Sequence, residues 1–150
     1  MNDIGYNDHE GYLKGLISHL YPTVDWSEPK PAHKLAGHSI IPDGRIGSDW
    51  VIELEGPKGL KQTRGALVDL AISQGQLKLL IVLFAPFPGS SMSSKSLEQH
   101  LMEVAQAIGP DKTWCIVALS NAMTKEEHLS LISDATRVHG LEPTRTAYVS

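Results

Sequence analysis

Three carboxylates are separated by even numbers of residues in segment 49–55 (DWVIELE), whose apolar residues alternate as in a β-strand. Side chains alternate between the two faces of a strand, so Asp49, Glu53 and Glu55 are expected on one face together with Val51. Side chains two residues apart on such a face lie roughly 6.5–7 Å from each other, which allows one hydrated cation to bridge Glu53 and Glu55. Acidic neighbours in a strand repel each other, and either a divalent metal or plain exposure to water would offset that repulsion.

A short basic stretch, residues 56–64 (GPKGLKQTR), follows the acidic segment directly. Carboxylates beside lysines are suited to phosphodiester hydrolysis, in which a bound Mg²⁺ activates water and a basic residue stabilises the developing charge. Lys61 and Arg64 are three residues apart on a predicted helix and are able to face the same phosphate backbone, with Lys58 just before them. The alternative is a solvated hairpin face whose Glu–Lys pairs contribute little to stability.

Hydrophobic periodicity and turn signals predict the elements that must position these residues. The two nearly all-apolar runs are typical of central strands covered on both faces, and two β–helix–β units after a hairpin imply a mixed sheet flanked by helices. The predicted hairpin joins strands 33–41 and 46–55 through a turn at Pro42-Asp43-Gly44. The other predicted elements are helix 9–20, a short strand at 24–26, helix 60–74, strand 77–85, helix 94–108, strand 113–120, helix 124–139 with a Thr124–Glu127 capping box, and an edge strand at 144–149.

Composition is that of an ordinary soluble globular protein, with 41% hydrophobic and 20% charged residues in a chain of 150. We expect one α/β domain over residues 1–150. The net charge of −4 means that contact with a polyanion needs a local basic patch or a metal. The single cysteine, Cys115, allows no intramolecular disulfide and is expected to be a buried, inert thiol. With no signal-peptide pattern, and with residues 79–88 too short to span a bilayer, we expect a cytoplasmic protein with no membrane partner.

Residues 49–56, 64–71 and 79–84 together resemble the PD-(D/E)xK nuclease superfamily, which includes restriction endonucleases and Holliday-junction resolvases. The resemblance covers roughly residues 9–86. It implies a restriction-endonuclease-like core (α-β-β-β-α-β), followed here by a C-terminal β-α extension. It also implies a Mg²⁺- or Mn²⁺-dependent endonuclease acting on nucleic acid, with DNA as the expected substrate. A homodimer is expected if the protein cuts a duplex, because one such domain presents one active site.

The chain departs from the superfamily pattern at the Glu-x-Lys motif, where it has Glu53-Leu54-Glu55. Some restriction enzymes of the superfamily carry Glu-x-Glu, with the second Glu acting as a general base or orienting water. The resemblance therefore implies that Glu53 is a metal ligand, that Glu55 occupies the lysine position, and that Lys58 or Lys61 supplies the positive charge. Glu10 stands where many members place an accessory acid, although an exposed helix acid near the N-terminal dipole is the simpler explanation.

The aspartate that would complete the metal site has two candidates. Asp43 matches the literal Pro-Asp dipeptide and reaches Glu53 only across the hairpin, whereas Asp49 lies roughly 13 Å from Glu53 along an extended strand. A bulge at residues 47–48 would bring either of them closer. We favour Asp43 slightly, although Asp43 in Pro-Asp-Gly is also an ordinary turn residue.

Other constellations are weaker. The Ser-rich segment 86–95 precedes a helix and is able to meet phosphate, but a flexible connector with Ser94 as N-cap is favoured. His33 and His38 would fall on opposite faces of a strand, which argues against joint ligation of a metal with Asp43. The other five histidines (9, 19, 100, 128 and 139) are expected at the surface. The main alternative to a nuclease is a non-catalytic α/β binding or immunity-type protein with a degenerate nuclease-like fold; a nucleotide-binding module using segment 86–95 is a third reading.

Overall fold

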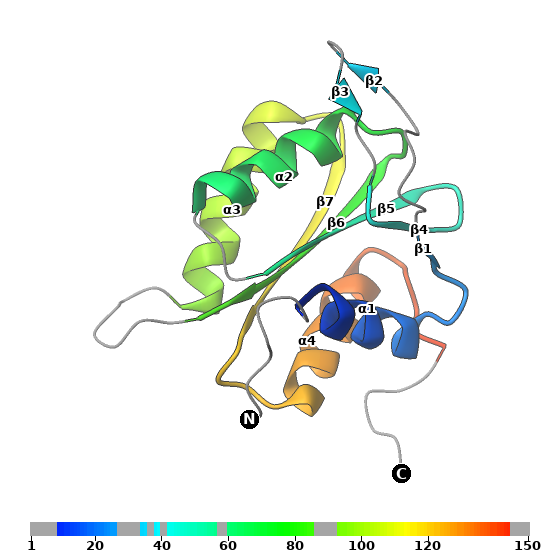
Figure 1. The fold of residues 1–150 in the computed structure, drawn as a ribbon, viewed down its shortest axis with the longest axis vertical. Coiled ribbons are helices and arrows are strands. Elements are labelled where there is room, and N and C mark those ends of the chain that lie inside the picture. Colours follow the sequence, from blue (N-terminus) through cyan, green and yellow to red (C-terminus); the bar gives the residue numbers. More distant parts are fainter. Residues whose placement is uncertain are drawn as a thin grey trace.

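A five-stranded mixed sheet with helices on both faces organises the chain in the computed structural model (Figure 1). The structure describes residues 9–26, 34–35, 38–39, 42–56, 60–85 and 93–144. The α/β class, with a mixed sheet flanked by helices, is confirmed. The elements are α1 (His9–Leu20), β1 (Asp25–Trp26), β2 (Lys34–Leu35), β3 (His38–Ser39), β4 (Gly44–Ile46), β5 (Trp50–Glu55), α2 (Leu60–Ile72), β6 (Leu77–Phe84), α3 (Ser94–Ile108), β7 (Thr113–Ser120) and α4 (Lys125–Val138).

The strands of the large sheet follow the order β1-β4-β5-β6-β7. β1, β4 and β5 form an antiparallel meander, and β6 and β7 continue the sheet parallel to β5. Helices α2 and α3 make the two crossover connections, as the β–helix–β pattern predicted. The carboxyl ends of β5, β6 and β7 therefore meet at one edge of the sheet, and the acidic end of β5 lies at this edge.

Each face of the sheet carries its own apolar cluster. Helices α1 and α4 cover one face and α2 and α3 cover the other (Figure 1). Leu79, Ile81 and Leu83 point into the first cluster, whereas Leu80 and Val82 point into the second, which explains why β6 is apolar at nearly every position. In β5 the same alternation places Val51, Glu53 and Glu55 on the face of the sheet that α2 covers.

The hairpin differs from the prediction. The chain turns at residues 47–49, where Gly47 adopts a positive φ of 63°, and not at Pro42-Asp43-Gly44. The reason is packing: pairing Ile46 with Trp50 buries both side chains in the cluster beneath α1 and α4. Asp43 lies in a bend directly before β4, and its amide donates to the Ile52 carbonyl at 3.0 Å.

Other element predictions are mixed. The predicted strand 33–41 is wrong within its described residues, because Lys34 pairs with Ser39 and the chain reverses between β2 and β3. The predicted edge strand 144–149 lies outside the described residues beyond Thr144. Helices 9–20 and 94–108 and strand 113–120 have the predicted bounds. Ser93, and not Ser94, is the N-cap of α3, with its hydroxyl accepting from the Ser96 amide at 3.1 Å. No helix in the described part of the chain is long and apolar enough to cross a membrane.

His128 corrects the surface assignment of the histidines, because it is fully buried on α4. Its Nε2 lies 2.7 Å from the Ser120 carbonyl and its Nδ1 lies 2.7 Å from the Tyr12 hydroxyl. An imidazole with both nitrogens bonded is a satisfied core residue that ties α1 to α4 and to the end of β7. Cys115 is buried as predicted, and burial raises the pKa of its thiol to about 12, which keeps it unreactive.

The capping box of α4 is confirmed and gives a stability prediction. The Thr124 hydroxyl accepts from the Glu127 amide at 3.1 Å, and the Glu127 carboxylate accepts from the Thr124 amide at 3.1 Å. We expect Thr124→Ala to lower the free energy of unfolding by about 1 kcal/mol, which lowers Tm by about 2–4 °C in thermal denaturation. Ser130→Ala, further along the same helix, is the control. A Thr124→Ala protein as stable as the parent would contradict this role.

Candidate functional site

Asp43 and Glu53 meet across the β4–β5 pair. The register that pairs Gly44 with Ile52 brings Asp43 opposite Glu53 when it is continued by one residue. The Asp43 amide donates to Glu53 Oε1 at 3.2 Å, and Asp43 Oδ2 accepts from the Leu54 amide at 2.7 Å. Each carboxylate thus bonds the backbone of the neighbouring strand, and the two acids are held side by side.

Asp49 lies apart from this pair. It is exposed in the 47–49 turn, at the opposite end of β5 from Glu55, and its carbonyl accepts from the Leu77 amide at 3.0 Å. The sequence did not decide which of the two aspartates accompanies Glu53. In the structure Asp43 lies beside Glu53, and Asp49 does not. The strand-face argument failed for Asp49 because β5 begins only at Trp50.

The electrostatics of Glu53 are strongly perturbed. Burial, with the charges of Asp43 and Glu55 and more weakly that of Asp69, raises the pKa of Glu53 to about 9, while the bond from the Asp43 amide opposes the rise. Glu53 is therefore protonated at neutral pH unless a positive charge reaches it. A carboxyl kept neutral by burial and by neighbouring acids is one that a divalent cation would convert to the carboxylate.

Asp69, on α2, is an acidic neighbour that the sequence reasoning missed. Its charge acts on Glu53, and burial raises the pKa of its own carboxyl. The available signal was helical spacing, because Asp69 follows the buried Ala66 by three residues and directly precedes the buried Leu70. Asp69 thus borders the face of α2 that packs on the sheet.

The two predicted basic residues that the structure describes, Lys61 and Arg64, are not bonded to Glu53. Lys58 lies outside the described residues, and Lys61 is exposed on α2. Arg64 points toward α3, where its Nη2 lies 2.9 Å and its Nε 3.3 Å from His100 Nε2. None of the charges found to act on Glu53 in the described part of the chain is basic.

Glu10, the predicted accessory acid, is exposed and forms an ion pair with Lys14 at 3.4 Å. Its neighbour His9 lies nearer to the acidic strand: a Cβ built on Gly56 would be 3.2 Å from His9 Nδ1. Gly56 follows Glu55 directly, so the first turn of α1 packs against the end of β5. The glycine permits this close approach. The resemblance to the superfamily did not predict a histidine at this place.

The donor set fits a hard divalent cation in its chemistry, because carboxylate oxygens are the ligands that Mg²⁺ prefers. The geometry is less complete: one oxygen of Asp43 and one of Glu53 accept backbone bonds. Within the described ranges, no group of three or more His, Cys, Asp or Glu side chains is arranged to hold a metal. Asp43 and Glu53 are the two acids that the β4–β5 register brings together.

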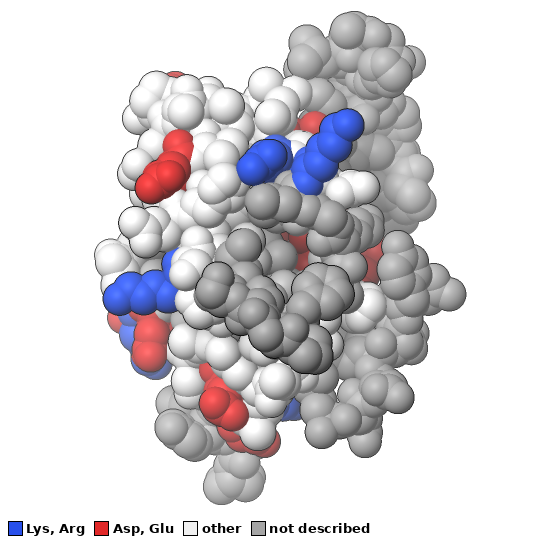
Figure 2. All heavy atoms as spheres, turned by 90° about the vertical axis from the view of Figure 1, so that its left-hand side faces the viewer, with Lys and Arg blue, Asp and Glu red and all other residues white. Residues whose placement is uncertain are grey.

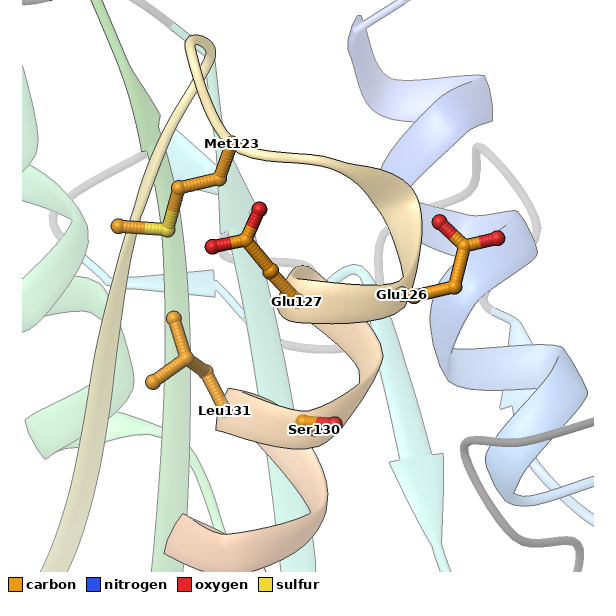
Figure 3. Close-up of a pocket in the computed structure, with 5 residues that line it drawn as sticks. All are labelled: Met123, Glu126, Glu127, Ser130 and Leu131. Atoms are coloured by element: carbon orange, nitrogen blue, oxygen red, sulfur yellow. The ribbon is translucent and has the colours of Figure 1, made fainter.

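Figure 2 shows the face at the left-hand side of Figure 1, where the basic and acidic side chains of the described residues are interspersed over the visible surface. A pocket of about 340 Å³ lies elsewhere, on α4 (Figure 3).

His38 belongs to β3, whereas His33 and residues 86–92 lie outside the described residues.

Comparisons of the chain with protein-family models, with curated proteins and with solved structures found no match. The functional assignment therefore depends on the residues and their geometry.

Proposed function

We propose that this protein is a metal-dependent nuclease with a restriction-endonuclease-like fold, which hydrolyses phosphodiester bonds of DNA. The observation that carries the proposal is the meeting of Asp43 and Glu53 across the β4–β5 pair, with Glu55 two residues further on. These are the positions at which the superfamily pattern places its aspartate and its Glu-x-Lys or Glu-x-Glu residues.

The order of the elements supports the proposal. A helix (α1), an antiparallel meander (β1, β4 and β5), a second helix (α2) and a parallel strand (β6) occur in the order of the α-β-β-β-α-β core, with the separate β2–β3 hairpin inserted between β1 and β4. β7 and α4 form the expected extension. The acids lie just before the second strand of the meander and at the end of its third strand, which is the edge where α/β proteins place their ligands.

Each residue has a role set by its place. Asp43 and Glu53 bind Mg²⁺ or Mn²⁺, which supplies the charge that activates water and screens the phosphate. Glu55, partly buried at the end of β5, orients the attacking water and accepts its proton. Lys61 and Arg64, both exposed on α2, bind the phosphate backbone.

Metal binding is expected to stabilise the folded protein. The free energy of unfolding should rise by about 2.7 kcal/mol at a Mg²⁺ concentration of 100 times Kd, and each kcal/mol raises Tm by about 2–4 °C. Thermal denaturation in Mg²⁺ and in EDTA measures this rise. Asp43→Asn should abolish it, whereas Asp49→Asn, which alters the same residue type in the exposed turn, should retain it. A parent protein whose Tm is the same with Mg²⁺, with Mn²⁺ and with EDTA would contradict the metal site.

A non-catalytic binding protein is the second candidate, and one observation favours it. The backbone bonds of Asp43 and Glu53 also serve as structural links within the hairpin. Incubation with supercoiled plasmid, single-stranded DNA and RNA, each with Mg²⁺ or EDTA, separates the candidates. Mg²⁺-dependent cleavage of any of these supports the nuclease, and intact substrates throughout support the binding protein.

A further inference from the structure

Lys78, on the central strand β6, is a fully buried charged residue that the proposed nuclease site does not use. Its Nζ donates to the Ser73 carbonyl at 2.8 Å and to the Ser73 hydroxyl at 3.1 Å. Ser73 directly follows α2, so the partial negative charge at the C-terminus of this helix offsets part of the ammonium charge. No hydrogen bond or ion pair found among the described residues joins Lys78 to a carboxylate. A buried ammonium of this kind is stabilised by any further negative charge nearby.

Arg45, on β4, lies on the same face of the sheet as Lys78. The strand register pairs Arg45 with Val51 and Val51 with Lys78, so these three residues form one row across β4, β5 and β6. Val51 packs in the cluster beneath α2 and α3, which places the row on that face. Arg45 Nη1 donates to the Gln74 carbonyl at 2.9 Å, one residue beyond the Ser73 carbonyl that Lys78 binds. The two cations therefore contact the same loop, between α2 and β6.

Lys112, just before β7, brings a third cation to this end of the sheet. The row continues from Lys78 to its register partner Trp114 on β7. A Cβ built on Gly109 would be 2.9 Å from Trp114 Cζ2 and 3.5 Å from Lys112 Cγ, so both side chains lie against this glycine. Arg45, Lys78 and Lys112 form a cationic cluster at the end of the sheet where β6 and β7 begin, which is its upper end in Figure 1.

Positive charge exceeds negative charge around the cationic cluster. Burial, with the charges of Lys112 and Arg45, lowers the pKa of Lys78 to about 8, and Asp111 is the one acid found to oppose this fall. Asp111 forms an ion pair with Lys112 at 3.6 Å and its side chain is 76% exposed. Asp49, in the turn before β5, is exposed as well. The three cations outnumber these two acids, and both acids lie in water while Lys78 is buried.

Arg45 and Lys112 keep donors that can reach a ligand. The bond to Gln74 uses one of the five N–H donors of the Arg45 guanidinium, and the Arg45 side chain is partly exposed. Lys112 is 25% exposed, and its distance of 3.6 Å from Asp111 Oδ2 is longer than a hydrogen bond. A phosphate group matches these donors, because its oxygens accept several charge-assisted hydrogen bonds and its negative charge is concentrated.

We propose that Arg45 and Lys112 bind a phosphate group at the end of the sheet where β6 and β7 begin, with the buried ammonium of Lys78 stabilising its charge from within the fold. The phosphate belongs either to a nucleic-acid backbone or to a free phosphate, and the recognition chemistry is the same for both. The cationic cluster lies at the opposite end of the sheet from Glu55, so this site does not depend on the acids of the candidate nuclease site.

An NMR titration in EDTA tests the proposal, with inorganic phosphate as the probe and chloride at equal ionic strength as the reference. Phosphate should shift the amide resonances of Gln76 and Lys112 along a saturating curve that chloride does not give. A short DNA duplex in the same buffer distinguishes the two sources. Saturation of these shifts by the duplex assigns the phosphate to a nucleic-acid backbone, and saturation by inorganic phosphate alone assigns it to a free phosphate. If neither probe gives saturating shifts at these amides, the proposal is wrong.

Matched lysine variants locate the contact. Lys112→Gln should weaken binding of the probe by at least about tenfold while the Tm stays that of the parent, because it removes a charge-assisted hydrogen bond at the surface. Lys78→Met removes the buried charge without altering a contact with the ligand, and it should weaken binding as well. Lys125→Gln changes an exposed lysine at the start of α4 and should bind as the parent does. A Lys112→Gln protein that binds as tightly as the parent would overturn the proposal.

Discussion

Glu53→Gln is expected to abolish Mg²⁺-dependent cleavage of DNA while the protein stays folded with an unchanged or raised Tm. Glutamine has the shape of the protonated carboxyl, the form that Glu53 takes at neutral pH because its pKa is raised to about 9. The amide oxygen of glutamine still accepts from the Asp43 backbone, but the side chain cannot bind a cation as a carboxylate does. A loss of about 4 kcal/mol of transition-state stabilisation corresponds to about a thousandfold lower rate.

Asp49→Asn is the control for this experiment, because it removes a carboxylate of the same segment that lies in the exposed turn. It should cleave at the parent rate. The measurement is the initial rate of plasmid cleavage at saturating Mg²⁺, with Tm recorded for each variant. If Glu53→Gln cleaves as fast as the parent, Glu53 is not a metal ligand and the assignment of the site is wrong.

The second large effect is a fall in stability as pH rises in the absence of metal. The pKa of Glu53 is about 9 in the folded protein, compared with an ordinary value of 4.5. The folded state therefore holds a proton that the unfolded state releases. The resulting stabilisation is fully present below pH 4.5 and is lost progressively as pH rises toward 9. The slope is at most about 1.4 kcal/mol per pH unit.

Chemical denaturation between pH 5 and pH 7 in EDTA measures this slope. The upper limit stays below the titration of Lys78, whose pKa burial lowers to about 8 and whose loss of a proton would raise stability at higher pH. The difference between the parent and Glu53→Gln isolates Glu53 from the histidines, which titrate in the same range. Identical pH profiles for the two proteins would show that Glu53 is not protonated in the fold.

Much of the fold was predictable because the signals were local. The all-apolar strand 113–120 and the periodic helix 9–20 carry their structure in their own pattern, and the Thr124–Glu127 capping box marks the start of α4. The α/β class follows from these elements. The position of the hairpin does not, since Pro42-Asp43-Gly44 and Gly47-Ser48-Asp49 both contain turn residues. The burial of Ile46 against Trp50 decides between them.

The candidate site was predictable only in part for the same reason. Glu53 and Glu55 are two residues apart in one strand, so their common face was predictable from the local pattern. The Pro-Asp dipeptide indicated Asp43. The contact of Asp43 with Glu53 depends on strand register, and the approach of Asp69 depends on how α2 packs on β5. These are tertiary features that no local pattern encodes. The buried His128 was missed because its two partners lie on other elements.

The central claim is that Asp43 and Glu53 form a site for a divalent cation, and ¹³C NMR of the side-chain carboxyl carbons tests it most directly. In EDTA the Glu53 resonance should titrate near pH 9. Saturating Mg²⁺ should shift that titration below neutral pH and move the Asp43 resonance together with it, while the Asp49 resonance stays unchanged. If Glu53 titrates at the same pH with and without Mg²⁺, the two acids do not bind the ion and the account is contradicted.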